Sequence, residues 1–364
     1  MYTYKTGAKG SKTLYLFMAL VIFGALFVIN PSLSLEAGSH SQEQVLEVES
    51  PRTNTTSSGE TLVLEEPSPY VLGQAYNRNL KMKVQVTNRG EETSRNIRLE
   101  VPLLSNLDSP YQTIEEEVFS HQPGEIKEGE KGSRSGIFQI ESLRPGESQT
   151  ITMDYTLMVS PLSMDFNHYN EELTFDLESP YREPSAKIES DHEKITAKAE
   201  ELTAGLEKDL DRAEAIYAFV VDHIKYDIHS PYRNQGALTA LEEGEGVCED
   251  YATLFAALNR ALGIPARQVN GFTDPRGTGH IWNLEAGQSL SLTNYRHSWA
   301  EFYLEGIGWV PVDPTFDIYS HTNRYFGALP QASHMAQNYQ DQSLRGRFQG
   351  GQLAVSWTNE LVRD

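Results

Sequence analysis

The chain has 364 residues, a formal net charge of −21 and a single cysteine. This length predicts two or three structural units rather than one compact domain. The negative charge argues against binding to nucleic acid, because another polyanion would be repelled. A single cysteine excludes an intrachain disulfide, so stability must come from ordinary hydrophobic cores.

The N-terminal residues have the pattern of a membrane anchor. Three lysines within residues 1–12 precede an uncharged apolar run from Thr13 to Ile29, which is just long enough to span a bilayer. Since lysines stay on the cytoplasmic side, we expect a basic cytoplasmic tail, a transmembrane helix at residues 13–30 and a single-pass cell-membrane protein that is mostly extracytoplasmic. A cleaved signal peptide is the alternative, although Leu35-Glu36-Ala37 is a poor cleavage site.

An all-β domain is expected after the anchor. Residues 31–60 are rich in Ser, Glu and Thr and predict a disordered tether. Within residues 61–185, short alternating strands separated by turns indicate an immunoglobulin-like β-sandwich, with residues 109–135 as long loops. The alternating runs are Leu80-Met82-Val84-Val86, Ile97-Leu99-Val101 and Ile151-Met153-Tyr155-Leu157. No catalytic pattern occurs here, so we interpret this domain as a spacer or binding module.

The hydrophobic period becomes helical at about Lys187. Ile195, Ala199 and Leu202 mark one helix, and apolar residues from Leu206 to Ile224 mark a second. Strand-like segments follow at residues 268–272, 298–304, 308–312 and 353–357. Helices before an antiparallel sheet predict an α+β fold for residues 187–320, with residues 321–364 as a C-terminal extension.

Cys248 precedes the apolar pattern of a further helix, which ends at Gly263. In the first turn, free backbone N–H groups and the helix dipole favour a thiolate. We interpret Glu249 and Asp250 as partners of that dipole rather than as acid–base residues. His297 opens a later strand and Asp313 follows the next strand. A cysteine, a histidine and an aspartate placed in this way are typical of thiol-dependent acyl transfer.

Four segments together resemble the transglutaminase-like superfamily. They are Gly-Val-Cys-Glu-Asp-Tyr-Ala at 246–252, Leu-Gly-Ile-Pro-Ala-Arg at 262–267, His-Ser-Trp-Ala-Glu at 297–301 and Gly-Trp-Val-Pro-Val-Asp-Pro-Thr at 308–315. The resemblance implies a papain-like core with Cys248 as nucleophile, His297 as general base and then acid, and Asp313 as the orienting residue. A membrane anchor and a β-sandwich before such a core are similar to the layout of bacterial members.

The implied chemistry is acyl transfer through a cysteine thioester. The thiolate attacks an amide carbonyl, ammonia or an amine leaves, and an amine or water resolves the thioester. This predicts transamidation or deamidation of peptide or protein substrates at the outer cell surface, without a cofactor or a metal. A cysteine peptidase or amidase with the same triad and a catalytically silent surface scaffold are the alternatives.

Several residues are alternatives or additions within this site. His280 is a second candidate base, although it lacks the following Glu and strand, and Asp317 is the alternative to the predicted aspartate. In the crosslinking animal enzymes a tryptophan before the nucleophile helps to hold the oxyanion, whereas here all four tryptophans follow Cys248. The Cys248 N–H is one expected oxyanion donor, and Gln235 and Tyr232 are candidates for the second.

Overall fold

The chain folds into a mixture of helices and mainly antiparallel sheets. The computed structural model describes residues 68–105, 109–129, 132, 134–169, 180–274, 285–318, 322–339 and 344–363, all within one compact unit, Glu65–Asp364. The predicted cytoplasmic tail, transmembrane helix and tether lie outside these ranges. Among the described residues, none of the helices combines the length and the apolar character needed to cross a bilayer.

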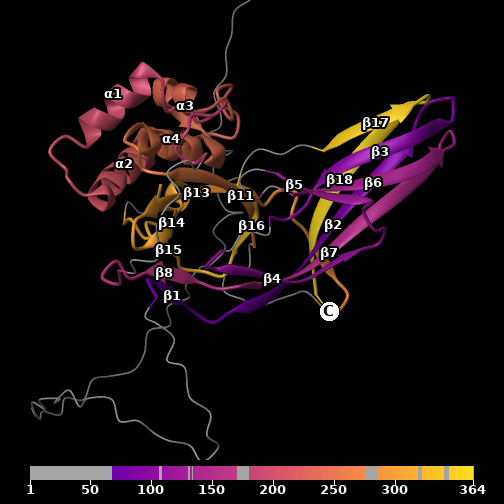
Figure 1. Ribbon diagram of the computed structural model, residues 1–364, viewed down its shortest axis with the longest axis horizontal. Coiled ribbons are helices and arrows are strands. Elements are labelled where there is room, and N and C mark those ends of the chain that lie inside the picture. Colours follow the sequence, from indigo (N-terminus) through magenta and orange to yellow (C-terminus); the bar gives the residue numbers. More distant parts are fainter. Residues whose placement is uncertain are drawn as a thin grey trace, which may run out of the picture. The chain divides into compact units, whose positions relative to one another are not determined.

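Two antiparallel sheets enclose one hydrophobic core and form what we call the β-domain (Figure 1). The first sheet has the order β12 (Ser289–Ser291), β18 (Leu353–Val362), β2 (Tyr76–Asn88), β7 (Ser148–Val159) and β4 (Gln112–Phe119). The second has the order β17 (Arg345–Gln349), β3 (Ser94–Pro102), β6 (Arg134–Leu143) and β5 (Glu125–Glu128). The predicted alternating runs lie on β2, β3 and β7, and their apolar side chains are buried. Period-two patterning therefore positioned these strands correctly.

The β-domain also contains strands that the sequence did not assign to it. β18 pairs with β2 from Leu353 opposite Asn88 to Val362 opposite Asn79, so the expected boundary at residue 185 and the separate C-terminal extension are wrong. The expected long loops at 109–135 contain β4 and β5. Most β4 side chains are at least partly exposed, and a bulge interrupts its pairing with β7, so the alternation that marks a half-buried strand is lost.

The helices pack with a four-stranded sheet to form the α+β domain. Its helices are α1 (Glu193–Leu202), α2 (Asp209–His223), α3 (Ala237–Glu243), α4 (Cys248–Ala261) and α5 (Pro314–Asp317). Its sheet has the order β14 (Gly308–Val312), β13 (Arg296–Leu304), β11 (Ala266–Thr273) and β16 (His334–Asn338). Every residue of α4 from Asp250 to Arg260 is buried, and Figure 1 shows α1 to α4 gathered against the sheet. The nucleophile helix is thus a central element of the core.

Strand β16 places part of the C-terminal stretch in this sheet. It pairs with β11, with Met335 opposite Phe272 and His334 opposite Thr273, so the α+β domain extends beyond the predicted end at residue 320. All five residues of β16 are buried. A uniformly buried short strand has no period-two signal, which explains why the sequence did not reveal it.

Two small sheets complete the described structure. One has the order β1 (Tyr70–Leu72), β8 (Leu162–Met164) and β15 (Ala328–Leu329), and the other pairs β10 (Glu245–Gly246) with β9 (Lys225–Tyr226) in parallel. The second pairing is functionally relevant, because it ties the chain after α2 to the residues directly before Cys248.

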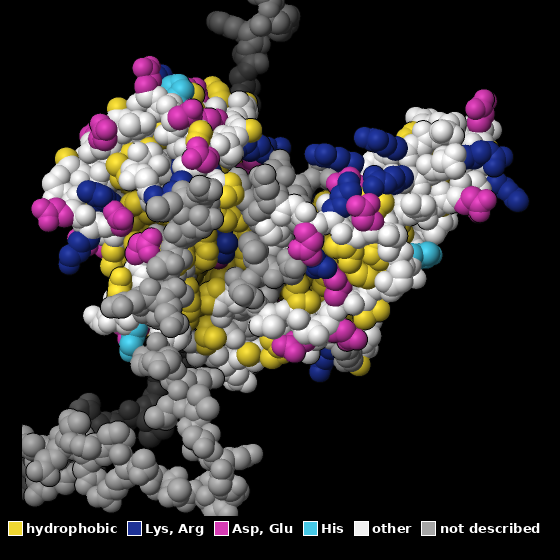
Figure 2. Space-filling model, viewed as in Figure 1, with side chains coloured by type: hydrophobic (Ala, Val, Ile, Leu, Met, Phe, Trp, Pro, Cys, Tyr) yellow, Lys and Arg dark blue, Asp and Glu magenta, His cyan; other side chains and the backbone are white. Residues whose placement is uncertain are grey.

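Acidic and basic side chains are interspersed over the face of the molecule shown in Figure 2. Ion pairs join neighbouring strands, such as Lys81 with Asp154 at 3.1 Å and Lys83 with Glu360 at 2.8 Å. Partly exposed pairs of this kind each contribute about 0–1 kcal/mol. That the chain does not bind nucleic acid stays a prediction from its net charge.

Candidate active site

Cys248 is the first residue of α4, as the sequence predicts, and is partly buried. Val247 precedes it in an extended conformation and acts as the N-cap. The first N–H groups of a helix have no partner within the helix, so the Cys248 amide lies where an oxyanion donor is needed. The buried body of α4 fixes the position of this helix start.

Asp250 closes the start of α4 with two backbone hydrogen bonds. Its carboxylate accepts from the N–H of Val247 and the N–H of Asn234, both at 2.8 Å. A Cβ on Gly246 would lie 2.4 Å from Asp250 Oδ2, so only glycine fits there. Burial raises the pKa of Asp250, and these two hydrogen bonds oppose that effect. The interpretation of Asp250 as a partner of the helix start is confirmed, while Glu249 pairs with Lys187.

The structure brings the three predicted catalytic residues together. His297 Nε2 lies 2.7 Å from Asp313 Oδ2, and the Cys248 side chain lies close enough to the same imidazole to raise its pKa. Because Nε2 is engaged with Asp313, Nδ1 is the ring nitrogen that remains for the thiol. The side chains come from the start of α4, the start of β13 and the residue after β14, so the topology orders them as thiol, imidazole and carboxylate.

Electrostatics favour a charged imidazole beside a charged carboxylate. Burial alone would lower the pKa of His297, but Asp313 and the Cys248 thiol together raise this pKa to about 10. Burial alone would raise the pKa of Asp313, but His297 and a second histidine hold it well below its usual range. An imidazolium that is stable at neutral pH is the partner that a thiolate requires.

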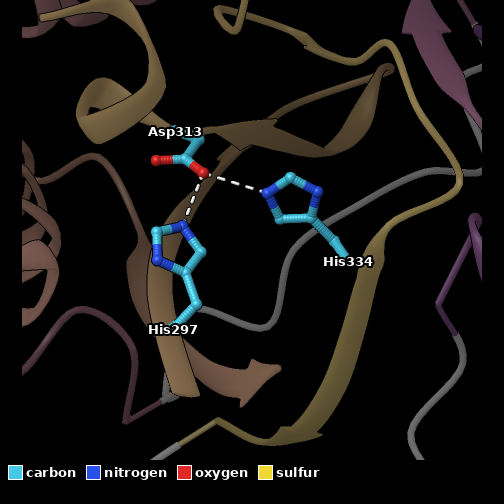
Figure 3. Close-up of side chains that lie close together, drawn as sticks. All are labelled: His297, Asp313 and His334. Atoms are coloured by element: carbon cyan, nitrogen blue, oxygen red, sulfur yellow. Dashed lines mark hydrogen bonds and ion pairs between the residues drawn. The ribbon is translucent and has the colours of Figure 1, made fainter. Parts of the chain in front are cut away.

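The second histidine is His334, which sequence reasoning missed. Its Nε2 lies 2.9 Å from the same oxygen, Asp313 Oδ2 (Figure 3), and its side chain is almost fully buried. Burial lowers the pKa of His334, with Asp313 opposing, so this ring is neutral and donates its Nε2–H. Nδ1 then accepts from the Ser333 hydroxyl at 3.2 Å. The sequence offered no signal for it, because His334 lies in the unassigned segment 321–364 without a recognisable motif around it.

His297, Asp313 and His334 also have the residue types of a metal site, with their ligand atoms within 4.8 Å of one another. Two imidazoles and a carboxylate suit zinc or iron. Ligand atoms that share a zinc ion at about 2.0 Å in a tetrahedral site are about 3.3 Å apart. Both nitrogens are closer than that to Asp313 Oδ2. These are hydrogen-bond distances, so the arrangement fits protons between the groups better than a metal ion.

The remaining sequence candidates are placed as follows. His280 lies outside the described residues. The Asp317 carboxylate accepts from the Tyr217 hydroxyl at 2.6 Å and the Tyr325 N–H at 2.8 Å, so it links α2 and α5. The hydrogen bond that His297 makes to a carboxylate is to Asp313. The Gln235 amide donates to Pro231 O at 2.6 Å, and Tyr232 is exposed. The second oxyanion donor therefore stays unassigned.

Aromatic rings surround the imidazole of His297. Phe316 lies 5.0 Å away between ring centroids, and Trp299 stacks at 6.0 Å. Trp299 and Phe302 are completely buried and belong to the packed interior. A wall of this kind excludes water from the hydrogen bond between His297 and Asp313 and strengthens it.

A profile of the transglutaminase-like superfamily matches residues 196–314. These residues form a transglutaminase-like core. The resemblance that four sequence segments predicted is thereby confirmed, and the matched range includes Cys248, His297 and Asp313. His334 and strand β16 lie beyond it.

Curated relatives share this transglutaminase-like core but differ in their names. Kyphoscoliosis peptidase of Homo sapiens is 32% identical over 132 residues, which are 34% of this chain and 19% of that protein. Protein-glutamine gamma-glutamyltransferase of Pseudomonas aeruginosa is 38% identical over 74 residues, 20% of this chain and 10% of that protein. The chain thus spans a fifth or less of these two relatives, and the likeness concerns the core alone.

One solved structure resembles a larger part of the chain. A candidate cysteine protease from Cytophaga hutchinsonii has a TM-score of 0.50 over 79% of this chain and 92% of its own, at 19% identity. At this identity the likeness shows the fold and not the reaction. Its extent exceeds the transglutaminase-like core.

Proposed function

We propose that the chain catalyses thiol-dependent acyl transfer on amide bonds of peptide or protein substrates. Cys248 is the nucleophile, His297 is the general base and then the general acid, and Asp313 orients the imidazole. The observation that carries this proposal is the convergence of the three side chains: Asp313 lies 2.7 Å from His297 Nε2, and Cys248 is near enough to raise the pKa of the same imidazole.

The reaction follows from this geometry in two halves. The Cys248 proton passes to His297 Nδ1, sulfur bonds to the amide carbonyl carbon, and the Cys248 N–H donates to the developing oxyanion. His297 then gives its proton to the leaving nitrogen, the C–N bond breaks, and ammonia or an amine departs. In the second half, an amine or water gives its proton to His297, attacks the thioester and releases Cys248. Throughout, Asp313 holds the Nε2–H.

Transamidation or deamidation of glutamine side chains is our first choice of reaction. It is supported by the superfamily of the core and by the named activity of the Pseudomonas relative. The test is incorporation of a fluorescent alkylamine into casein by the full-length chain, with Cys248→Ala as the inactive variant. We expect amine incorporation, or ammonia release without the amine, to disappear in Cys248→Ala. Equal activity of that variant would refute the proposal.

A cysteine peptidase or amidase is the second candidate. The names of the kyphoscoliosis peptidase and of the Cytophaga structure favour it. Because the first half-reaction is shared, the leaving group separates the two functions. Release of new amino termini from casein, dependent on Cys248 and without amine incorporation, would assign the chain to this class.

A catalytically silent scaffold is the third candidate and is tested on the thiol itself. An activated cysteine reacts with iodoacetamide faster at neutral pH than a free thiol does, because thiolate is already present. We expect stoichiometric labelling of Cys248 that slows in His297→Ala. Labelling at the rate of a free thiol, or no labelling, would favour the scaffold.

We further propose that the chain is anchored in the cell membrane with its core outside the cytoplasm. The three lysines before the apolar run of residues 13–29 support this orientation. In intact cells, a tag after Asp364 is expected to be removed by added protease, and deletion of residues 1–30 is expected to release the chain from the membrane fraction. A protected tag would contradict the orientation.

A further inference from the structure

The register of the central sheet puts His297 and His334 on one face. β11 lies between their strands, with Gly271 opposite His297 and Thr273 opposite His334. Positions two apart on a strand point to the same side, so both imidazoles project toward the face where Asp313 ends β14. Figure 3 shows the carboxylate between the two rings. His334 therefore reaches the triad from the edge strand on the far side of β11.

Among the residues that the structure describes, three donors bind the Asp313 carboxylate. Oδ1 accepts from the Thr315 N–H at 3.1 Å, and Oδ2 accepts from both imidazoles. The carboxylate is completely buried, so each donor also replaces a lost water contact. Without His334, Oδ2 would be held by His297 alone, which is the group that must move protons during the reaction.

Strand β16, which carries His334, is held by the β-domain. Gln112, the first residue of β4, binds Ala336 through both amide atoms, accepting from its N–H at 2.8 Å and donating to its C=O at 2.9 Å. At this edge of the sheet, the Gln112 side chain thereby makes the two hydrogen bonds that the backbone of a neighbouring strand would make. Met335 packs into the hydrophobic core of the β-domain.

A buried arginine fixes the approach to the same strand. Arg78 of β2 pairs with Asp274, directly after β11, at 2.8 Å, and donates to Ala332 O at 2.9 Å. Both charged side chains are almost fully buried, where a charge pair is tolerated only with good geometry. The β-domain thus makes hydrogen bonds to the chain on both sides of His334, at Ala332 and at Ala336.

We propose that His334 is a positioning residue for the acyl-transfer reaction, and that the β-domain takes part in that reaction by fixing the strand that carries it. The inference rests on the proposed function. His334 holds Asp313 in the orientation that keeps Nδ1 of His297 toward Cys248. The β-domain is then more than the spacer or binding module that its sequence indicates.

The first test compares His334→Leu with His334→Gln. Gln can present an N–H near the position of Nε2, whereas Leu fills space without a donor. We expect His334→Leu to slow iodoacetamide labelling of Cys248 and substrate turnover by about tenfold or more, and His334→Gln to restore most of the rate. Near-ultraviolet circular dichroism checks that both variants keep the native packing.

The pH profile distinguishes positioning from mere packing. If Asp313 is held less firmly, it stabilises the His297 imidazolium less, and the pKa of His297 falls. The alkaline limb of the pH–rate profile, where the rate declines at high pH, is then expected at lower pH in His334→Leu than in the wild type. Tyr217 of α2 and Tyr325 also face Asp313, and burial raises the pKa of both, so they stay neutral. A rate like that of the wild type would overturn the proposal. An alkaline limb at higher pH in His334→Leu would also overturn it, because His334 would then be shown to compete with His297 for the Asp313 carboxylate.

The second test addresses the β-domain. Gln112→Glu keeps an acceptor for the Ala336 N–H but loses the donor to Ala336 O, and Gln85→Glu on exposed β2 surface makes the same change of charge as a control. We expect Gln112→Glu to slow labelling and to lower the alkaline limb, as His334→Leu does, and the double variant to be little worse than His334→Leu alone. If the effects of Gln112→Glu and His334→Leu on the labelling rate were fully additive, or if Gln112→Glu reacted at the wild-type rate, the β-domain would have no part in positioning His334.

The two proposals fail in different ways. Turnover that persists in Cys248→Ala refutes the proposed function. Turnover that requires Cys248 but is unchanged in His334→Leu refutes this inference and leaves the function standing.

Discussion

At the scale of single residues, the site depends on which donors bind each of the two carboxylate oxygens of Asp313. Oδ1 caps α5 through the Thr315 N–H, and Oδ2 receives both imidazoles. The same side chain therefore terminates a strand, starts a helix and orients the base. This double use couples the local fold to the chemistry, since the α5 cap restricts the rotation of the carboxylate.

Replacing Asp313 separates orientation from charge. Asn keeps an oxygen for the His297 N–H but loses the negative charge, so we expect the rate at pH 7 to fall by about tenfold or more and the alkaline limb to move to lower pH. Ala removes both functions and is expected to cost about 10³-fold. The measurement is the rate of alkylamine incorporation from pH 5 to pH 10.

The matched control is Asp154→Asn, which removes a carboxylate from the exposed ion pair with Lys81. It is expected to leave the profile unchanged. Equal profiles for Asp313→Asn and the wild type would mean that the carboxylate charge does not support the imidazole.

The pKa of His297 also predicts how stability changes with pH. Folded His297 has a pKa of about 10, above the ordinary value of 6.5, so the folded chain keeps a proton that the unfolded chain releases in this window. The stabilisation from this group is fully present below pH 6.5 and is lost as the pH rises toward 10. The measurement is urea unfolding of the chain with and without His297→Gln, with Cys248 kept in both and a reductant present, at pH 6, 8 and 10. The difference in free energy of unfolding is expected to shrink with pH, and a growing difference would contradict the assignment.

Sequence reasoning located Cys248, His297 and Asp313 because each lies at a recognisable boundary. Cys248 follows two glycines and opens a helix, His297 opens a strand, and Asp313 precedes Pro314. His334 has no such marker. Its role arises from sheet order, which brings a strand from a later part of the chain beside β11, and sheet order is a tertiary property that residue patterns do not encode.

At the scale of elements, the approach of β16 to β11 depends on Gly271. A Cβ there would lie 2.0 Å from the Met335 carbonyl oxygen and 3.1 Å from Ala336 Cα. These are backbone atoms of β16, so the clash can be relieved only if the whole strand moves. The absence of a side chain at this position is what permits the register that places His334 beside Asp313.

Gly271→Ala is therefore expected to displace β16. We predict a loss of about 1–3 kcal/mol in the free energy of unfolding together with slower labelling of Cys248. Gly346→Ala on β17 is the matched control, because its nearest contact would be a side-chain atom of Leu99 at an ordinary 3.4 Å. Urea unfolding and iodoacetamide labelling measure the two effects. Equal behaviour of the two variants would show that the Gly271 contact is not limiting.

The elements that the sequence predicted well are those with one buried face or stripe. Leu80 to Val86 of β2 alternate cleanly, and Ile195 and Ala199 of α1 are buried at helical spacing. The elements that it missed have no such contrast. Most of β4 is at least partly exposed and β16 is wholly buried, so neither shows the periodic change in hydrophobicity that marks a strand in a sequence.

At the scale of the whole molecule, buried polar contacts join the β-domain to the transglutaminase-like core. Besides Arg78 and Gln112, the Tyr111 hydroxyl donates to Glu301 Oε1 at 2.8 Å and accepts from Trp299 Nε1 at 3.2 Å. Glu301 in turn pairs with buried Arg267 at 2.6 Å. Breaking such a pair by removing one partner costs about 3–5 kcal/mol, because the other charge stays buried.

This connection predicts that the two parts unfold together. If either part opened alone, Asp274 or Glu301 would lose a buried partner, so partial unfolding is penalised on both sides. Hydrogen exchange of the β7 and α4 amides in increasing urea is expected to converge on one free energy of unfolding. In Arg78→Met the two sets should separate, because the contacts to Asp274 and Ala332 are lost, whereas Arg98→Met on the exposed sheet surface should leave them together. A wild-type chain in which β7 exchanges at a lower free energy than α4 would show that the β-domain opens independently and could not hold His334 in place.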